Sequence, residues 1–296
     1  MDWQRPIARI LNWVEEKFDR LQYGSKGERV RKGKLSITPY LGFGASRFIY
    51  LKGRVLEKKR ILPSKEGDTI WDNLVNMYRR IQSDEIPGVR VRASYQSVQV
   101  ETVTDNEGFF ELRLDLPTSV PPEVDWQSVN LELLSPQTAS NALEQVQGRV
   151  LLINPQAQYG VISDIDDTIL ITHATNPVRM GLTMFLNNAR TRQTFPDVPH
   201  FYQALQQGTQ GLAVNPLFYV SSSPWNMYDL LVEFLQVQGI PLGPMVSLRD
   251  WGITRQEFLP SKHRQHKLGA IRVILDLLPN LPFLLIGDSG QEDAQI

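Results

Sequence analysis

In the second half of the chain, short apolar runs end abruptly in polar residues that can carry chemistry. Val161 and Ile162 lead directly into Ser163-Asp164-Ile165-Asp166-Asp167-Thr168. Carboxylates repel one another when crowded, so an acidic cluster at the end of a buried strand indicates a bound cation or a proton to be moved. The apolar runs 217–220 and 283–286 also end in polar segments. Such runs, alternating with helices, are typical of a parallel sheet covered on both faces.

The polar residues at these strand ends predict a single site. In a parallel sheet the carboxyl ends of the strands lie along one edge, and ligands bind there. Ser221 follows the second apolar run, and Asp288 and Asp293 follow the third. Lys267 belongs to a basic cluster, 262–267, that we place just before the helix leading to the last strand. We therefore expect these side chains to meet at one edge of the sheet.

Phosphoryl transfer is the chemistry that suits this set of residues. A carboxylate nucleophile and a phosphate are both anionic, so a divalent cation and a lysine would offset their repulsion. Magnesium (Mg²⁺) takes oxygen ligands and is well served by two carboxylates together with a substrate phosphate. Asp164 would then be both metal ligand and nucleophile, forming an aspartyl-phosphate. Asp166 would protonate the leaving oxygen and later activate water, and its backbone carbonyl could face the metal.

The order of these clusters resembles the haloacid dehalogenase (HAD) superfamily of phosphatases. The motifs are Asp164-x-Asp166-x-Thr168, then Ser221, then Lys267, then Gly287-Asp288 with Asp293. More narrowly, Tyr219-Val-Ser-Ser-Ser-Pro-Trp225-Asn, Leu248-Arg-Asp-Trp251-Gly and His266-Lys267 resemble the catalytic domain of actin-patch-type phosphatidate phosphatases. The resemblance covers about residues 155–296. It implies an α/β fold with a Rossmann-like, HAD-type parallel-sheet catalytic domain.

The resemblance also implies a role for each candidate residue. Asp164 matches the nucleophile, Asp166 the general acid and base, and Lys267 the charge-neutralising lysine. Asp288 matches the second magnesium carboxylate with Asp293 as its supporting partner, so the expected metal set is Asp164, Asp166, Asp288 and Asp293. The expected substrate-binding residues are Thr168, which braces the loop, Ser221, which hydrogen-bonds the phosphoryl group, and the adjacent Ser222.

Between about residues 35 and 135 the apolar residues recur with a period of two. Segments of this kind, separated by turns, predict a β-sandwich domain over residues 35–150 that precedes the catalytic domain. Asp105-Asn-Glu-Gly108 is the expected turn between two strands, and residues 68–82 predict a helix. The six expected strands are 35–40, 47–56, 89–95, 98–104, 108–114 and 129–134.

The first 34 residues predict a basic amphipathic helix, over 2–22, and a linker. Residues 1–65 hold 16 Lys and Arg against 6 Asp and Glu, whereas the remainder holds 15 against 26. A basic front end suits an anionic partner, and the apolar stripe of the helix suits either a membrane surface or its own domain. Peripheral contact of residues 1–34 with an anionic membrane therefore stays open, and we expect no nucleic acid as a partner.

The composition of the chain excludes several kinds of functional site and several classes of protein. The chain has no cysteine, which excludes disulfides, thiolate catalysis and cysteine-ligated zinc or iron–sulfur clusters. No apolar run approaches the roughly 20 residues of a spanning helix, and the N-terminus lacks a signal-peptide pattern. We expect a cytoplasmic protein, peripheral at a membrane surface. Because the sequence ends at Ile296, just past the last motif, we expect a catalytic domain that is either truncated or unusually short, with weak activity if a missing helix anchors the acidic loop.

The sequence thus predicts a magnesium-dependent phosphatase that acts on phosphatidate-like lipid phosphates through an aspartyl-phosphate, as part of lipid metabolism. Two alternatives stay open. The substrate could be a soluble or protein phosphate ester, or the chain could be a catalytically weak membrane or protein adaptor. The apolar residues at 180–186 suit a lid over the nucleophile or a packed helix equally well.

Overall fold

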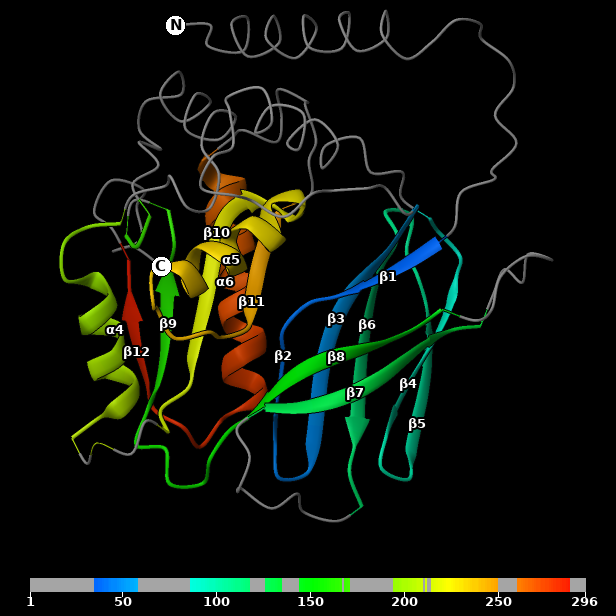
Figure 1. Ribbon diagram of the computed structural model, residues 1–296, viewed down its shortest axis with the longest axis horizontal. Helices are drawn as coiled ribbons and strands as arrows, with labels where there is room; N and C mark the ends of the chain where they lie inside the picture. The colour runs from blue at the N-terminus through cyan, green and yellow to red at the C-terminus, as the bar shows by residue number, and fades with distance from the viewer. Residues whose placement is uncertain are drawn as a thin grey trace, which may run out of the picture.

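The computed structural model describes residues 35–57, 86–117, 126–134, 144–166, 168–170, 194–209, 211, 214–249 and 260–287. These described residues form two sheets that lie side by side, one from each half of the chain (Figure 1). Four predictions lie outside them: the basic helix at 2–22, the helix at 68–82, the lid at 180–186 and the placement of Asp288 and Asp293. No helix in the described ranges is long and apolar enough to cross a membrane.

The N-terminal sheet contains eight strands with one core. They are β1 (Leu35–Pro39), β2 (Gly42–Ala45), β3 (Phe48–Glu57), β4 (Arg90–Tyr95), β5 (Val98–Val103), β6 (Phe109–Asp115), β7 (Trp126–Leu133) and β8 (Gln145–Leu152). They follow the order β1-β3-β2-β8-β7-β4-β5, with β6 paired to β3. Every pair is antiparallel except β2 with β8. Buried and exposed residues alternate along β4 and β6, as expected for strands with one face on a core.

All six strands expected in this half are present, to within a few residues at each end, and two more accompany them. The strand β2 could not be predicted from alternating apolar residues, because glycine fills two of its four positions. A Cβ at Gly42 or Gly44 would come within 2.4 Å of the carbonyl oxygen of Tyr50 or Phe48 on β3. These glycines therefore permit a close approach of backbones, a requirement that leaves no apolar pattern in the sequence.

The predicted turn at 105–108 is confirmed. The Asp105 carboxylate accepts hydrogen bonds from the backbone N–H groups of Glu107 (2.9 Å) and Phe109 (2.8 Å). Gly108 has a φ of 76°, in the left-handed region that glycine adopts without strain. The turn thus joins β5 to β6 through the turn chemistry that the sequence indicates.

Thr104, which precedes this turn, ties it to the segment before β4. Its buried hydroxyl accepts a hydrogen bond from Val89 N (2.9 Å) and donates one to Ile86 O (2.8 Å). We expect Thr104→Val to lower the free energy of unfolding by about 1–3 kcal/mol, because both backbone groups are left buried without this partner. Urea denaturation measures the change. Thr102→Val, in β5 itself, is the control and should change the stability by less than about 0.5 kcal/mol. Equal effects of the two variants would contradict the role given to Thr104.

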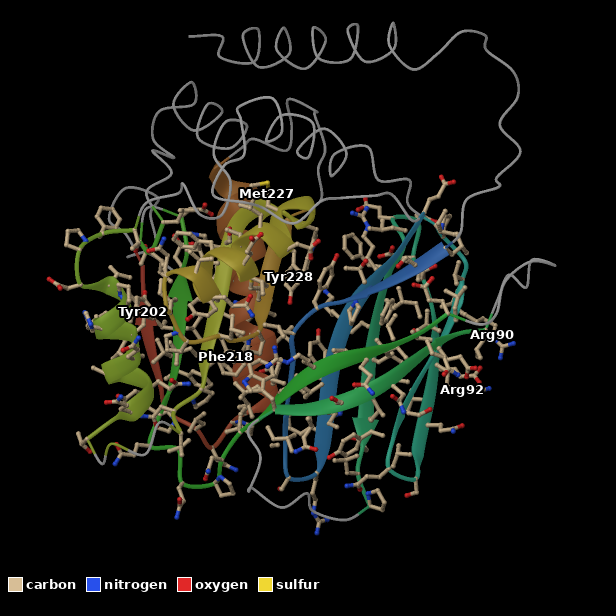
Figure 2. The ribbon with its side chains drawn as sticks, in the orientation of Figure 1. Arg90, Arg92, Tyr202, Phe218, Met227 and Tyr228 are labelled. Atoms are coloured by element: carbon tan, nitrogen blue, oxygen red, sulfur yellow. The ribbon has the colours of Figure 1, made fainter. Side chains whose placement is uncertain are left out.

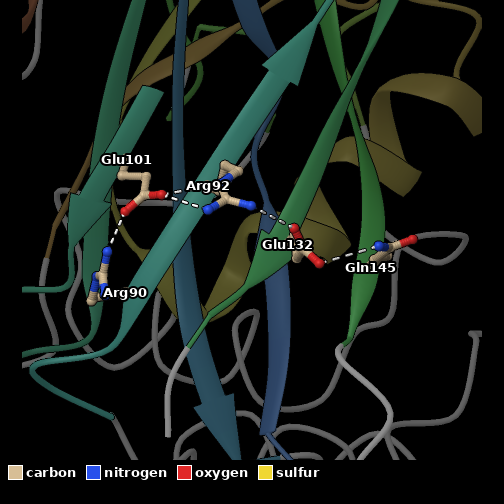
Figure 3. A network of polar contacts seen from close by, with 5 residues as sticks. All are labelled: Arg90, Arg92, Glu101, Glu132 and Gln145. Atoms are coloured by element: carbon tan, nitrogen blue, oxygen red, sulfur yellow. Dashed lines mark hydrogen bonds and ion pairs between the residues drawn. The ribbon is translucent and has the colours of Figure 1, made fainter. Parts of the chain in front are cut away.

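A network of charged side chains and one amide side chain crosses four strands of the N-terminal sheet (Figure 3). The guanidinium of Arg92 on β4 contacts Glu101 on β5 (2.7 Å) and Glu132 on β7 (3.4 Å). Gln145 on β8 donates to Glu132 (3.4 Å), and Arg90 also pairs with Glu101. Hydrogen bonds from Arg92, and then from Arg90, lower the pKa of Glu101. The stabilisation is therefore present above the unfolded-state pKa of this group and is lost as the pH falls through its lower folded-state value.

The C-terminal sheet has four strands, all parallel. They are β9 (Gly160–Asp164), β10 (Leu217–Pro224), β11 (Met245–Arg249) and β12 (Phe283–Ile286), in the order β11-β10-β9-β12. Leu217 and Tyr219 share a core with helices α4 (Val198–Gln207) and α5 (Tyr228–Val237). Phe218 and Val220 share another with α6 (Pro260–Leu277). Alternate residues of β10 thus face opposite sides of the sheet.

The two sheets, which lie side by side, are in direct contact. Phe43 of β2 lies against Phe218 of β10, with ring centroids 5.2 Å apart in an edge-to-face arrangement. Phe48 and Tyr50 of β3 belong to the same core cluster as Ala270 of α6. The N-terminal sheet therefore covers part of the C-terminal half, although the expected domain limits, 1–34, 35–150 and 155–296, stay a prediction.

The predicted fold class, an α/β fold with a Rossmann-like, HAD-type catalytic domain, is wrong. Twelve strands stand against three α-helices in the described residues, and the larger sheet is a mixed one of eight strands. The prediction took the fold class from the apolar runs of the C-terminal half, whereas the strands with a period of two in the N-terminal half supply most of the regular structure. The β-sandwich also differs from expectation, because β6 pairs with β3 and contacts β5, so that one sheet curls around its core.

Candidate active site

The site lies where β9 ends. Each residue of this strand is buried, and its last residue, Asp164, is 2% exposed. Asp164 stands opposite Val220 of β10, and the N–H of Ile165 donates to the Val220 carbonyl (3.0 Å). Asp166, two residues further, is 6% exposed. The strand and its neighbours thus bury two carboxylates, and a buried charge needs a partner.

Lys267 supplies a positive charge for Asp164. The Lys267 Nζ lies 2.9 Å from Asp164 Oδ1, and both side chains are almost fully buried, at 4% and 2% exposure. The sequence pattern placed Lys267 just before a helix, which is wrong, because α6 already begins at Pro260. The first two turns of α6 are polar, so a search for apolar spacing finds only the later part of the helix. The buried pair brings opposite charges together in a medium that screens them poorly.

Ser221 connects the second strand end to Asp166. Its hydroxyl donates a hydrogen bond to Asp166 Oδ2 at 2.6 Å, and both residues are buried. Since Ser221 follows the last residue of β10 that pairs with β9, the register of the two strands brings these side chains together. Four of the predicted residues, Asp164, Asp166, Ser221 and Lys267, are therefore joined in two contacts at one edge of the sheet.

The remaining predicted residues divide into two groups. Thr168 is described, and its buried hydroxyl has no hydrogen-bond partner within the described ranges. Ser222 continues the backbone of β10, but its side chain, like Asp288 and Asp293, lies outside what the structure describes. In the described part of the chain, no three His, Asp or Glu side chains gather into a metal-binding group. The carboxylates of Asp164 and Asp166 are nevertheless the oxygen donors that magnesium prefers.

Two further residues support the end of β9 and were not predicted. The Ser163 hydroxyl donates to the backbone carbonyl of Asp164 (2.8 Å) and lies 2.5 Å from the hydroxyl of Tyr202 on α4. Because Ser163 uses its single proton on that carbonyl, Tyr202 donates to Ser163. Burial, and more weakly the nearby Asp164, raise the pKa of Tyr202 to about 12. Figure 2 labels Tyr202 on α4, together with Phe218 of β10. In the sequence Tyr202 is one apolar position of a helix, so no signal marks it.

Comparison with known proteins shows what the segment that carries this site is similar to. Residues 159–296 match the family model described as phosphatidate phosphatase APP1, catalytic domain. Phosphatidate phosphatase APP1 of Saccharomyces cerevisiae is 31% identical over 137 residues, which are 46% of this chain and 22% of the yeast protein. An uncharacterized protein of Schizosaccharomyces pombe is 25% identical over 234 residues, which are 76% of this chain and 36% of that protein. This chain therefore spans well under half the length of either relative.

Similarity among solved structures is weaker. The match to a carbohydrate acetylesterase from Xanthomonas citri covers 88% of this chain and 66% of the acetylesterase chain, with 12% identity and a TM-score of 0.29. Such a score does not establish a shared fold. The sequence comparisons are the informative ones: residues 159–296 are similar to the catalytic domain of phosphatidate phosphatase APP1. The predicted resemblance of this half to actin-patch-type phosphatidate phosphatases is therefore confirmed, whereas the HAD superfamily is not supported.

Proposed function

We propose that this chain is a phosphoric monoester hydrolase that removes phosphate from phosphatidate through an aspartyl-phosphate. The observation that carries the proposal is the buried Asp164–Lys267 pair, set beside the Asp166–Ser221 hydrogen bond in the segment similar to the APP1 catalytic domain. The substrate class rests on the name of the yeast relative. A carboxylate beside a lysine and a second carboxylate is the combination that nucleophilic phosphoryl transfer uses.

The proposed reaction has two steps. First, an Asp164 carboxylate oxygen attacks phosphorus, the bond from phosphorus to the glycerol oxygen breaks, and Asp166 gives its proton to that oxygen. Second, Asp166 takes a proton from water, the water oxygen attacks the phosphorus of the aspartyl-phosphate, and Asp164 is released with inorganic phosphate. Lys267 offsets the negative charge gathered around Asp164 in both steps. Ser221, through its hydrogen bond, fixes the orientation of the Asp166 carboxylate that must transfer the proton.

Magnesium fits the oxygen donors at this strand end. Asp164 and the backbone carbonyl of Asp166 would hold the ion, and Asp288, supported by Asp293, would complete the set. When bound, the ion supplies positive charge that lowers the repulsion between the carboxylate and the phosphate. The proposal includes a cytoplasmic protein whose residues 1–34 contact the anionic membrane surface that holds the substrate.

The test is phosphate release from vesicles that contain phosphatidate, with magnesium and after its removal by EDTA. We expect activity with magnesium, its loss in EDTA and its return when magnesium is restored. Asp229→Asn on α5 is the control, because this exposed carboxylate lies outside the proposed site and should leave the rate unchanged. Full activity in EDTA would contradict the role of magnesium.

Two outcomes of the same assay would redirect the proposal. Turnover of soluble phosphate esters, or of phosphorylated peptides, without turnover of phosphatidate would replace the substrate class. No turnover of any of these esters, with retained binding to anionic vesicles, would favour an adaptor over an enzyme. Sedimentation with anionic and with neutral vesicles measures that binding for the full chain and for a variant lacking residues 1–34. Equal binding by both proteins would contradict the membrane role of this segment.

A further inference from the structure

The backbone segment that carries Ser221 leaves the sheet soon after this residue. β10 pairs with β9 from Leu217 to Val220, in register with Val161 to Asp164, and this pairing does not extend to Ser221. On its other side β10 pairs with β11, but the register shifts twice, and beyond Val220 the described pairing resumes at Pro224, opposite Arg249. Residues 221–224 therefore have fewer ladder contacts than the rest of the strand, although Ser221 must hold Asp166 at 2.6 Å.

Trp225 is the next residue, and it is fixed by the N-terminal sheet. The Trp225 ring stacks on Tyr40, with centroids 4.2 Å apart and planes at 20°. The centroid of the Phe109 ring, at the start of β6, lies 5.6 Å from that of the Trp225 ring. Trp225 is 7% exposed and Tyr40 is 4% exposed. Two segments that are far from Trp225 in sequence thus enclose a residue adjoining the Ser221 segment.

Two polar contacts fix residues of this aromatic cluster to backbone groups of the N-terminal half. The N–H of Leu41 donates to the hydroxyl of Tyr228 (2.6 Å), whose ring lies 4.5 Å from that of Tyr40. Figure 2 labels Tyr228, the first residue of α5, on the side nearer the N-terminal sheet. On the other side, the buried guanidinium of Arg54 lies over the ring of Phe109 (4.3 Å) and donates through Nε to Glu107 O (2.8 Å). Fixed hydrogen bonds of this kind give rings one orientation, which packing alone does not.

We infer that the N-terminal sheet is a positioning element for the catalytic strand end, and that Tyr40 is its principal positioning residue. Tyr40 and Phe109 pack against Trp225, and Arg54 holds Phe109. Trp225 in turn fixes the backbone of residues 221–224 so that Ser221 meets Asp166. Tyr40 acts through Trp225 and does not touch the reacting atoms. The inference rests on the proposed function for its catalytic consequence, because a displacement of about 1 Å at such a site can lower a rate about 100-fold.

The test compares the same substitution at two buried tyrosines of the N-terminal half, Tyr40 between β1 and β2 and Tyr95 at the end of β4. Tyr40→Leu removes the ring that stacks on Trp225, and Tyr95→Leu removes a ring of similar burial in the separate core of the N-terminal sheet. Hydrogen–deuterium exchange, followed by mass spectrometry of the peptide containing residues 221–224, reports the order of the strand end without any need for activity. Steady-state kinetics on phosphatidate vesicles, well below the melting temperature of each variant, separates kcat from KM.

We expect Tyr40→Leu to speed exchange at residues 221–223 and to lower kcat by about 10- to 100-fold, with KM changed less than about twofold. Tyr40→Phe, which keeps the ring, should restore most of kcat. Tyr95→Leu should lower the melting temperature but leave the exchange of this peptide and kcat as in the unmodified protein. Unchanged exchange in Tyr40→Leu, or the same changes in Tyr95→Leu, would overturn the inference. If the unmodified protein releases no phosphate, the proposed function fails, and the exchange comparison still decides whether Tyr40 orders the strand end.

Discussion

Replacing Asp164 with asparagine is expected to lower kcat for phosphatidate by at least about 10⁴-fold. The substitution keeps the size of the side chain but removes the anionic oxygen that attacks phosphorus, and no other group in the proposed mechanism replaces it. Asp166 lies two residues away, but its carboxylate accepts the Ser221 hydrogen bond and is assigned to proton transfer. The measurement is phosphate release from vesicles under saturating phosphatidate and magnesium.

The control for this variant has to separate a lost nucleophile from a lost fold. Asp164 is 2% exposed and pairs with Lys267, so its removal also leaves a buried cation with one partner fewer. Circular dichroism and a melting curve show whether Asp164→Asn remains folded at the assay temperature. Asp229→Asn, an exposed change of the same chemistry, should retain the full rate. A folded Asp164→Asn protein that keeps more than about a tenth of the activity would exclude Asp164 as the nucleophile.

The sequence was sufficient to place Asp164, Asp166 and Ser221 together at one edge of the sheet but not to find the residues around them, and the catalytic roles stay a prediction. The apolar run of β9 followed by acidic residues is a local pattern, and so is the serine that ends β10, which is why Asp164, Asp166 and Ser221 could be predicted. The contact between Tyr202 and Ser163 depends on how α4 packs against β9, because the two residues are 39 positions apart in the sequence. Such a contact has no periodicity of its own, because a helical tyrosine on an apolar face usually marks core packing.

The errors in the fold have the same origin. The expected strands are set by alternation within each segment, and they are found. The neighbours of a strand are set by long-range pairing, so neither the parallel pairing of β2 with β8 nor the curl that brings β6 near β5 could be derived from local patterns. The stack of Tyr40 on Trp225 joins residues 185 positions apart, and only the structure reveals it. The residues with reactive groups are thus easier to predict than the residues that hold them in place.

Replacing Lys267 with methionine is expected to lower both activity and stability. Methionine keeps much of the length of the side chain but removes the charge 2.9 Å from Asp164 Oδ1. Loss of one preorganised charge in a buried site lowers kcat by about 10²- to 10³-fold. Breaking a buried ion pair from one side lowers the free energy of unfolding by about 3–5 kcal/mol, because the other charge stays buried with one partner fewer. Phosphate release and urea denaturation measure the two effects.

A double variant distinguishes the electrostatic role of Lys267 from a packing role. In Asp164→Asn with Lys267→Met both charges are absent, so no uncompensated charge remains, and the stability should return to within about 1 kcal/mol of the unmodified protein. Activity should stay as low as in Asp164→Asn, because the nucleophile is still missing. Losses of stability that simply add would mean that Lys267 contributes through the packing of its aliphatic chain. Recovery of stability without recovery of activity would instead mean that the buried pair is retained for its chemistry, since an uncharged pair of similar size supports the fold as well.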